Sequence, residues 1–241
     1  MDKYDLKALE KGLNQLDITL NDHQIGQFIE YYELLVEWNS FMNLTAITKF
    51  DEVITKHFLD SLAIVKAIDI QKIKCVIDIG TGAGFPGIPL KIAFPHLEVT
   101  LLDSLNKRIK FLNEVITKLN LNSMKPIHGR AEDYAGQLQY REQYDLCVSR
   151  AVANLSSLSE YCLPYVMIGG NFISYKSGNV DIEVKEAEKA ICMLGGSLKE
   201  TLHFQLPDTD LERSFVIIEK KKKTPKLYPR KAGLPTKEPI K

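Results

Sequence analysis

The sequence lacks the features that would place it in or across a membrane. None of its apolar runs reaches the ~18 residues that a membrane-spanning helix needs. Residues 1–16 are charged and contain no apolar core of the kind found in secretory signals. We therefore expect a cytoplasmic protein with no membrane partner. Its 241 residues, 45% hydrophobic and 26% charged, suffice for one large α/β domain or for a core domain with an appended element.

Cysteine is scarce, and none of it is arranged to hold a metal ion. The four cysteines, Cys75, Cys147, Cys162 and Cys192, form no C-x-x-C pair. Because zinc sites depend on such ligand spacing, the sequence predicts no metal. Two cysteines lie in strand-like apolar runs and two in helix-like ones, which favours reduced, buried thiols.

The net charge of the chain is zero, but its charged residues are unevenly distributed. The chain has 31 basic and 31 acidic residues, whereas residues 220–241 hold nine Lys or Arg and the single acid Glu238. A basic segment of this kind attracts a polyanion while the acidic body stays soluble. A solvated, disordered terminus explains the same composition equally well.

Residues 1–70 are predicted to form a helical extension. Asn21 and Gln24 fit a capping box, and apolar residues then recur at helical spacing from Ile25 to Val36. A loop with Asn39, Asn43 and Thr45 is expected next. A further helix is expected from Asp51, with His57 and Asp60 on a face beside its apolar stripe.

Residues 71–220 alternate between strand and helix patterns. Strands are predicted at 75–79, 99–103, before Gly129, at 144–149, 171–175, 198–205 and 214–219, with helices at 89–94, 107–119, 152–166 and 182–194. This alternation predicts a doubly wound, mostly parallel sheet. No helix separates the last two strands, so they should pair as an antiparallel hairpin. Residues 221–241 are left as a basic tail.

A glycine-rich turn follows the first strand. Gly80, Gly82 and Gly84 allow a sharp turn and close approach to a ligand, and Asp78 stands just before them. Residues 82–87 also match G-x-G-x-x-G, the dinucleotide fingerprint, which would indicate an NAD-dependent oxidoreductase. Three features oppose that reading: the fingerprint starts late, Pro86 and Pro89 disturb the helix start, and Asp78 would repel a pyrophosphate. The acid would instead attract the cationic methionine part of S-adenosylmethionine, and the pattern resembles motif I of class I methyltransferases.

Later strand ends add further candidates. Asp103 ends the second strand, where a carboxylate accepts ribose hydroxyls in nucleoside and dinucleotide sites alike. Ala131 and Glu132 follow the third strand, where class I methyltransferases typically contact adenine; a solvated loop acid is the alternative for Glu132. The fourth strand ends in Ser149-Arg150-Ala151-Val152, with no Asn-Pro-Pro-Tyr or Pro-Cys motif. With neither base nor nucleophile there, a target that is already nucleophilic is favoured. Guanine N7 has a lone pair and no proton to remove, so positioning and electrostatics would suffice.

Together these segments resemble the glucose-inhibited division protein B family. The resemblance rests on 78–87 (Asp-Ile-Gly-Thr-Gly-Ala-Gly-Phe-Pro-Gly), Asp103-Ser104, Lys107-Arg108, Phe111-Leu112, 129–132 (Gly-Arg-Ala-Glu), 149–152, Trp38-Asn39, 43–47 (Asn-Leu-Thr-Ala-Ile), His57-x-x-Asp60-Ser61-Leu62 and 228–235 (Tyr-Pro-Arg-Lys-Ala-Gly-x-Pro). The match spans nearly the whole chain.

Members of that family are bacterial small-subunit (16S) ribosomal RNA guanine-N7 methyltransferases. The resemblance therefore implies S-adenosylmethionine as methyl donor, 16S RNA or a ribosomal particle as partner, and a class I methyltransferase fold. With the motifs above it assigns donor binding to Asp78, Gly80, Gly82, Gly84, Phe85, Asp103, Ala131, Glu132 and Arg150, with Arg150 also the candidate catalytic residue through positioning and charge. The RNA candidates are Lys107, Arg108, Lys220, Lys221, Lys222, Lys223, Tyr228, Arg230 and Lys231.

Some alternatives stay open at this stage. A noncatalytic nucleotide- or RNA-binding regulator with the same fold is the second function class. Asn39, Asn43, His57 and Asp60 fit buried capping and packing as well as they fit substrate contact. Tyr228 and Arg230 fit RNA stacking and binding, or packing back onto the sheet. A monomer is expected.

Overall fold

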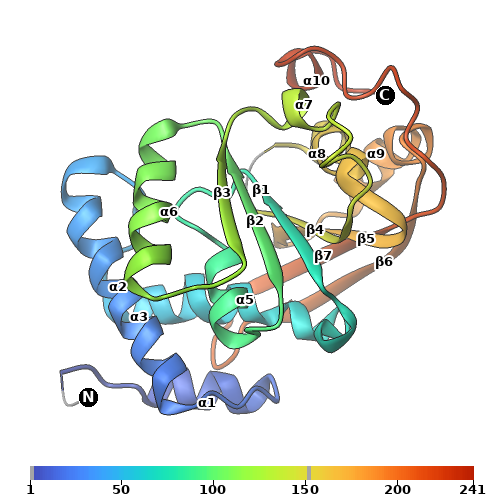
Figure 1. The fold of residues 1–241 in the computed structure, drawn as a ribbon. Helices are drawn as coiled ribbons and strands as arrows, with labels where there is room; N and C mark the ends of the chain where they lie inside the picture. The colour runs from blue at the N-terminus through green and yellow to red at the C-terminus, as the bar shows by residue number, and fades with distance from the viewer. Residues whose placement is uncertain (1–2, 151–152) are drawn as a thin grey trace.

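The structure is a computed structural model that describes residues 3–150 and 153–241 (Figure 1). Ala151 and Val152, the end of the motif after the fourth strand, lie outside the described residues. The α-helices are α1 (Lys7–Gln15), α2 (Asp22–Met42), α3 (Phe50–Val53), α4 (Asp60–Leu62), α5 (Gly87–Ala93), α6 (Asn106–Lys118), α7 (Ala131–Tyr134), α8 (Leu155–Cys162), α9 (Asp181–Met193) and α10 (Leu234–Lys237). A π-helical turn covers Ile54–Leu59, and short 3-10 turns cover Ala63–Lys66, Ile70–Lys72 and Leu163–Tyr165.

Seven strands form one mixed sheet. They are β1 (Cys75–Ile79), β2 (Glu98–Asp103), β3 (Met124–His128), β4 (Tyr144–Arg150), β5 (Val166–Ser177), β6 (Gly196–Gln205) and β7 (Glu212–Lys220), in the order β3-β2-β1-β4-β5-β7-β6. β1 to β5 pair in parallel, and β7 pairs antiparallel with both β5 and β6. The predicted doubly wound sheet and terminal hairpin are confirmed. Because β7 lies antiparallel between β5 and β6, this sheet also differs from the all-parallel sheet of the dinucleotide-binding fold.

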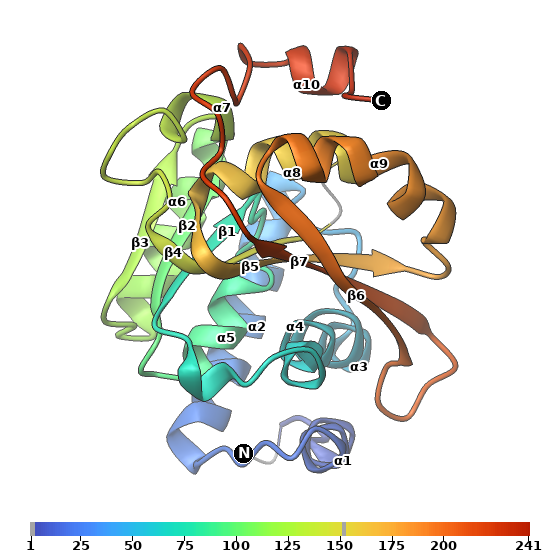
Figure 2. The same ribbon diagram turned by 90° about the vertical axis from the view of Figure 1, so that its right-hand side faces the viewer.

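Helices cover both faces of the sheet, and the sheet divides the core into two clusters. Along β1, Val76 packs with the N-terminal helices, α5 and α6, whereas Ile77 and Ile79 pack with α8 and α9 on the opposite face. This alternation follows from the two-residue period of a strand. Figure 2 shows the sheet between α8 and α9 above and α2 to α5 below, with α1 at the bottom. None of the helices in the described part of the chain is long and apolar enough to cross a membrane.

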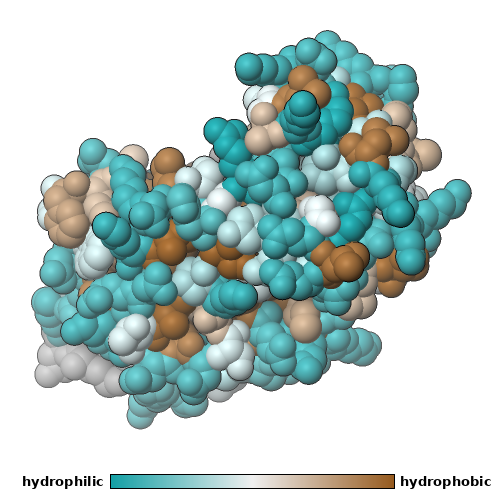
Figure 3. All heavy atoms as spheres, turned by 45° about the horizontal axis from the view of Figure 1, so that its top comes forward, coloured by the Kyte–Doolittle hydropathy of each residue, from teal (hydrophilic) through white to brown (hydrophobic). Residues whose placement is uncertain are grey.

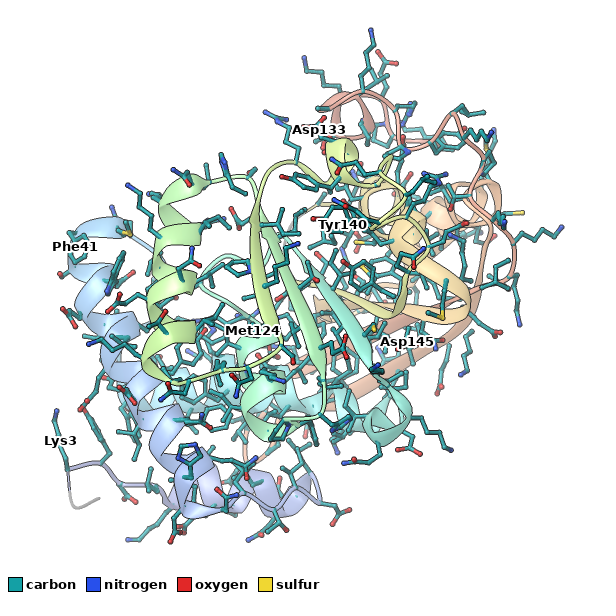
Figure 4. The ribbon with its side chains drawn as sticks, viewed as in Figure 1. Lys3, Phe41, Met124, Asp133, Tyr140 and Asp145 are labelled. Carbon is teal, nitrogen blue, oxygen red and sulfur yellow. The ribbon has the colours of Figure 1, made fainter. Side chains whose placement is uncertain are left out.

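The two ends of the sheet have different roles. Met124 and Asp145 mark the amino ends of β3 and β4, and Asp133 of α7 marks the opposite end (Figure 4). At the amino end, the Asp145 carboxylate accepts hydrogen bonds from the backbone amides of Lys74 and Cys75 at 3.0 and 2.7 Å. The glycine-rich turn and the other predicted site residues lie at the carboxyl end, where the switch of direction between β1 and β4 opens a crevice.

The N-terminal helices differ in detail from the sequence prediction. The capping box at Asn21 and Gln24 is confirmed in both directions, at 2.9 and 3.0 Å. The helix α2 nevertheless continues through Asn39, which was expected in a loop, and ends at Met42 with Asn43 in the left-handed region. Asn tolerates that conformation well, so it ends the helix one turn later than predicted. The π-helical turn containing His57 was not predicted.

The basic tail is folded onto the domain. Residues 221–241 run past α8 and α7 and include the short helix α10 (Figures 1 and 2). The Arg141 guanidinium holds the start of this segment by donating to the carbonyl oxygens of Thr224 and Tyr228 at 2.8 and 3.0 Å. The expectation of four buried thiols also needs correction, because Cys192 is exposed and Cys75 is only partly buried.

Candidate functional site

The glycine-rich turn is shaped by backbone conformation and by the acid beneath it. Gly80 and Gly82 have φ values of 71° and 64°, in the left-handed region that favours glycine. Asp78 is fully buried, and its Oδ2 accepts from Thr81 Oγ1 at 2.7 Å and from the Gly87 amide at 2.9 Å. The sequence placed this acid against the ligand, whereas the structure places it under the turn, where it ties Thr81 to the start of α5.

The environment of Asp78 is unusual for a carboxylate. Its Oδ1 is buried without a hydrogen-bond partner among the described residues. Burial raises the pKa of Asp78 to about 7, although the hydrogen bonds from Thr81 and Gly87 and the charge of Arg150 act in the opposite direction. The acid is therefore close to its titration point at neutral pH.

Two adjoining cavities lie over the turn. The loop cavity, about 380 Å³, is lined by Leu44, Thr45, His57, Gly80, Thr81, Gly82, Ala83, Phe85, Asp103, Ser104, Arg108 and Arg150. The strand-end cavity, about 210 Å³, is lined by Ile79, Gly80, Leu102, Asp103, Ser104, Gly129, Arg130, Ala131, Glu132 and Tyr161. They share Gly80, Asp103 and Ser104, so they form one elongated crevice across the carboxyl ends of β1, β2 and β3.

Asp103 stands at the junction of the two cavities. It is 2% exposed; its Oδ2 accepts from the Gly82 amide at 2.9 Å and from Arg108 at 3.0 Å, and its Oδ1 accepts from the Leu105 amide at 2.9 Å. A carboxylate has about four acceptor positions, so capacity for a ligand hydroxyl remains. Arg108, an RNA candidate from sequence, is thus a partner of Asp103 and lines the loop cavity.

The end of β4 carries a charged cluster that the sequence only partly indicated. Arg150 donates to Asp60 Oδ2 at 2.8 Å, and Arg213 at the start of β7 donates to Asp60 Oδ1 at 2.7 Å. Asp60 is 4% exposed, so two cations compensate one buried carboxylate. Asp60 therefore links the helical extension to β4 and β7. Arg213 was missed because an arginine at the start of a strand carries no motif of its own.

His57 joins this cluster to the glycine-rich turn. Its ring stacks on Phe85 with centroids 4.4 Å apart, and Arg150 lies over the same Phe85 ring at 5.1 Å. Burial, reinforced by the charge of Arg150, lowers the pKa of His57 to about 3, so the ring is neutral at physiological pH. His57 and Asp60, three residues apart, both contact the Arg150 guanidinium. A third cavity of about 360 Å³ meets the loop cavity at His57 and Arg150.

The two asparagines that the sequence left open have structural surroundings. The Asn39 side chain accepts from the amides of Leu44 and Thr45 at 2.7 and 2.8 Å and fixes the segment after α2. Thr45 in turn lies 2.9 Å from His57 Nε2. Asn39 thereby supports the wall of the loop cavity, and Asn43 supplies the left-handed turn.

The far end of the crevice is formed by α7 and α8. Ala131 lines the strand-end cavity, and its carbonyl oxygen accepts from Tyr165 at 2.6 Å. Glu132 Oε1 accepts from the Gly233 amide at 2.8 Å. Tyr161 of α8 also lines this cavity and was missed, because a tyrosine inside an apolar helix pattern indicates packing.

The structure separates the RNA candidates into exposed and buried groups. Lys220 is 0% exposed, and its ammonium donates to the Leu163 carbonyl and to Thr224 at 2.5 and 2.7 Å. Tyr228 is buried, and Arg230 makes a bidentate pair with buried Glu160, with contacts of 2.6 to 3.1 Å. The side chains of Lys220, Tyr228 and Arg230 therefore pack against the protein. Lys221, Lys222, Lys223 and Lys231 are exposed, and exposed Lys107 donates to the Met42 carbonyl at 2.9 Å.

The surface around this end of the molecule is polar. Figure 3 shows the top of the Figure 1 view brought forward, with a mainly hydrophilic surface and small, separate hydrophobic patches. Such a face suits a polar partner better than an apolar one. Within residues 3–150 and 153–241, no group of three or more His, Cys, Asp or Glu side chains is arranged to hold a metal ion.

The strand order, with the crevice at the carboxyl ends of β1 to β3, is that of the class I methyltransferase fold. Among solved structures, M. jannaschii TYW2 in complex with AdoMet matches with a TM-score of 0.51 at 14% identity, covering 62% of this chain and 70% of that one. At this identity the likeness concerns the fold alone.

The sequence comparisons identify the family. A profile of the family described as rRNA small subunit methyltransferase G matches residues 24–215, and the chain belongs to this family. The chain is 59% identical over 230 residues to the ribosomal RNA small subunit methyltransferase G of Lachnoclostridium phytofermentans, covering 95% of each. It is 51% identical over 241 residues to that of Clostridium tetani, covering 100% of each.

Proposed function

We propose that this protein transfers the methyl group of S-adenosylmethionine to N7 of a guanine in 16S ribosomal RNA. The observation that carries the proposal is the crevice, formed by two cavities that share Gly80 and Asp103, in a chain of this family. A cytoplasmic enzyme acting on the small-subunit RNA or an assembling particle follows from that function.

The residues around the crevice fit the methyl donor. Asp103 has acceptor capacity for one ribose hydroxyl beyond its three protein hydrogen bonds, and the strand-end cavity beside Ala131 and Glu132 would hold the adenosine half. Gly80, Gly82, Phe85 and Arg150 line the loop cavity, which would hold the methionine half. Asp78 and Gly84 would support the donor site by shaping the turn, without contacting the donor. A side chain at Gly84 would collide with Ile88 and Tyr31.

The reaction needs positioning more than proton transfer. The donor supplies an electrophilic methyl group on a sulfonium; the N7 lone pair forms the new C–N bond as the C–S bond breaks, and its electrons stay on sulfur. No proton leaves N7, so no base is required, and His57 is neutral at physiological pH. We assign Arg150 an orienting role, since Asp60, His57 and Phe85 fix its guanidinium on three sides.

The competing function is a noncatalytic RNA- or nucleotide-binding regulator. Incubation of the purified protein with tritium-labelled S-adenosylmethionine and 16S RNA separates the two. We expect radioactivity to enter the RNA, and loss of the methylated guanine in a deletion strain would locate the nucleotide. Donor binding without transfer to free RNA or to small-subunit particles would favour the regulator.

A further inference from the structure

The segment after β7 makes a series of specific contacts with the helices that border the strand-end cavity. We call residues 224–241 the C-terminal strap. Figures 1 and 2 both place its helix α10 beside α7 and α8. Arg230 anchors it, because both its backbone amide and its guanidinium donate to the Glu160 carboxylate, which is 0% exposed. A bidentate, buried pair of this kind holds one geometry.

Beyond that anchor the strap follows α8 toward the cavity. Ser157 Oγ donates to the Pro235 carbonyl at 2.7 Å, and the hydroxyls of Tyr161 and Thr236 lie 2.5 Å apart. The Gly233 amide donates to Glu132 Oε1 at 2.8 Å. Two of the side chains held in this way, Glu132 and Tyr161, line the strand-end cavity.

We propose that the C-terminal strap is a positioning element of the donor site, acting through Glu132 and Tyr161. This inference rests on the proposed function, in which the strand-end cavity takes the adenosine half of the donor. Glu132 sits on a helix of four residues and is partly exposed, so its carboxylate would otherwise sample several rotamers. The strap fixes one carboxylate oxygen and leaves the other for the nucleoside, which lowers the entropy lost on binding.

Gly233 is the residue on which this contact depends. Its φ is +83°, and an added Cβ would meet nothing nearer than an Arg130 nitrogen at 4.0 Å. Alanine would therefore fit in space but would strain the backbone in the left-handed region. The Gly233→Ala variant moves or weakens the amide contact with Glu132 without a collision.

The test is calorimetric titration of the full-length protein with S-adenosylhomocysteine. We expect Gly233→Ala to weaken binding about fivefold, because Glu132 loses the contact that fixes its carboxylate before the ligand binds, and Thr236→Val to weaken it in the same direction. Lys226→Ala, an exposed change in the same strap, is the matched control and should leave the affinity unchanged. In a Glu132→Ala background the effect of Gly233→Ala should disappear, because the two changes then act on one contact.

Three results decide between the alternatives. Wild-type affinity in both Gly233→Ala and Thr236→Val would overturn the inference while leaving the proposed function intact. An equal loss caused by Gly233→Ala with or without Glu132 would also overturn it, because the Gly233 amide would then not act through its contact with Glu132. Failure of the wild-type protein to bind S-adenosylhomocysteine would instead reject the proposed donor site, and the role of the strap with it.

Discussion

Gly82 and Gly84 lie two residues apart with positive φ, yet their surroundings differ. A Cβ at Gly82 would meet only the Gly80 carbonyl oxygen, at 4.0 Å, in the loop cavity. At Gly84 it would collide with Ile88 and Tyr31. We expect Gly82→Val to abolish donor binding in a folded protein, because its branched side chain would enter the cavity and strain the turn.

The matched variant Gly84→Ala should instead lower the melting temperature first. Calorimetric titration and thermal denaturation monitored by circular dichroism measure the two effects side by side. Near-normal affinity in Gly82→Val would contradict the prediction.

Asp78 should make the folding stability depend on pH in a defined direction. Its pKa is raised from an ordinary 3.8 to about 7 in the folded protein, so between these values the folded chain keeps a proton that the unfolded chain has lost. This contribution favours folding near pH 4 and is lost as the pH rises toward 7. Asp78→Asn lacks it, so the stability of the variant relative to wild type should rise over this window by on the order of a few kcal/mol.

Urea unfolding at several pH values between 4 and 8 measures this difference. Asp133→Asn, a change at an exposed aspartate, is the control whose curve should run parallel to that of wild type. A difference between Asp78→Asn and wild type that does not vary with pH would rule out the assigned titration.

At the scale of elements, the end of β7 carries four consecutive lysines with two different roles. Lys220 is buried among the Leu163 carbonyl, Thr224 and Glu142, whereas Lys221, Lys222 and Lys223 are exposed. Replacing the three exposed lysines with glutamine should flatten the salt dependence of RNA binding by up to about 2 units of log–log slope, at about 0.7 per contact. Donor affinity should not change.

Lys220→Met serves as the comparison. It should lower the free energy of unfolding by about 2 kcal/mol or more, because buried hydrogen bonds from a charged group are lost, and it should leave the slope alone. Filter binding over a salt series gives the slopes. An unchanged slope in the triple variant would remove these lysines from the RNA surface.

The elements themselves were largely predictable, and the exceptions have physical causes. Local signals such as the Asn21–Gln24 capping box and the strand at 75–79 were sufficient, because they depend on neighbouring residues alone. The end of α2 was placed too early, since Asn39 is a weak helix former but is held there by its bonds to the segment that follows. The π-helical turn at Ile54–Leu59 has no sequence period that distinguishes it from an α-helix.

At the scale of the whole molecule, the helical extension and the sheet share one hydrophobic cluster. Tyr31 of α2 donates to the Ala83 carbonyl in the glycine-rich turn, and its ring lies tilted beside Phe85 and stacked with Phe111. We therefore expect the chain to unfold in one cooperative transition despite its modular sequence pattern. The ring centroid of Trp38, the single tryptophan, lies 5.7 Å from that of Phe111, so its fluorescence reports on unfolding of the helical extension.

Urea unfolding followed by Trp38 fluorescence and by far-ultraviolet circular dichroism tests this expectation. The two midpoints should coincide, and S-adenosylhomocysteine should raise both by the same amount. A fluorescence transition at lower urea would show that the extension unfolds separately.

The candidate site was predictable where its residues follow strand ends. Gly80, Asp103 and Ala131 line the crevice as expected, because parallel strands bring their carboxyl ends together. The burial of Lys220 was not predictable, because nothing in four consecutive lysines distinguishes one from the next. The Asp60–Arg150–Arg213 cluster joins three distant segments, and that meeting depends on tertiary packing.

The position of β7 between β5 and β6 has a consequence for how the chain is made. Synthesis proceeds from the amino end, so β6 leaves the ribosome before β7, the strand with which it pairs among the described residues. Until Glu212–Lys220 has emerged, β5 presents an open edge and β6 has nothing to pair with. The nascent protein thus exposes unpaired strands late in translation, and the insertion of β7 covers the edge of β5 and gives β6 a partner. We expect a fragment that ends between these strands to aggregate more readily than the full chain, because the edge of β5 stays open.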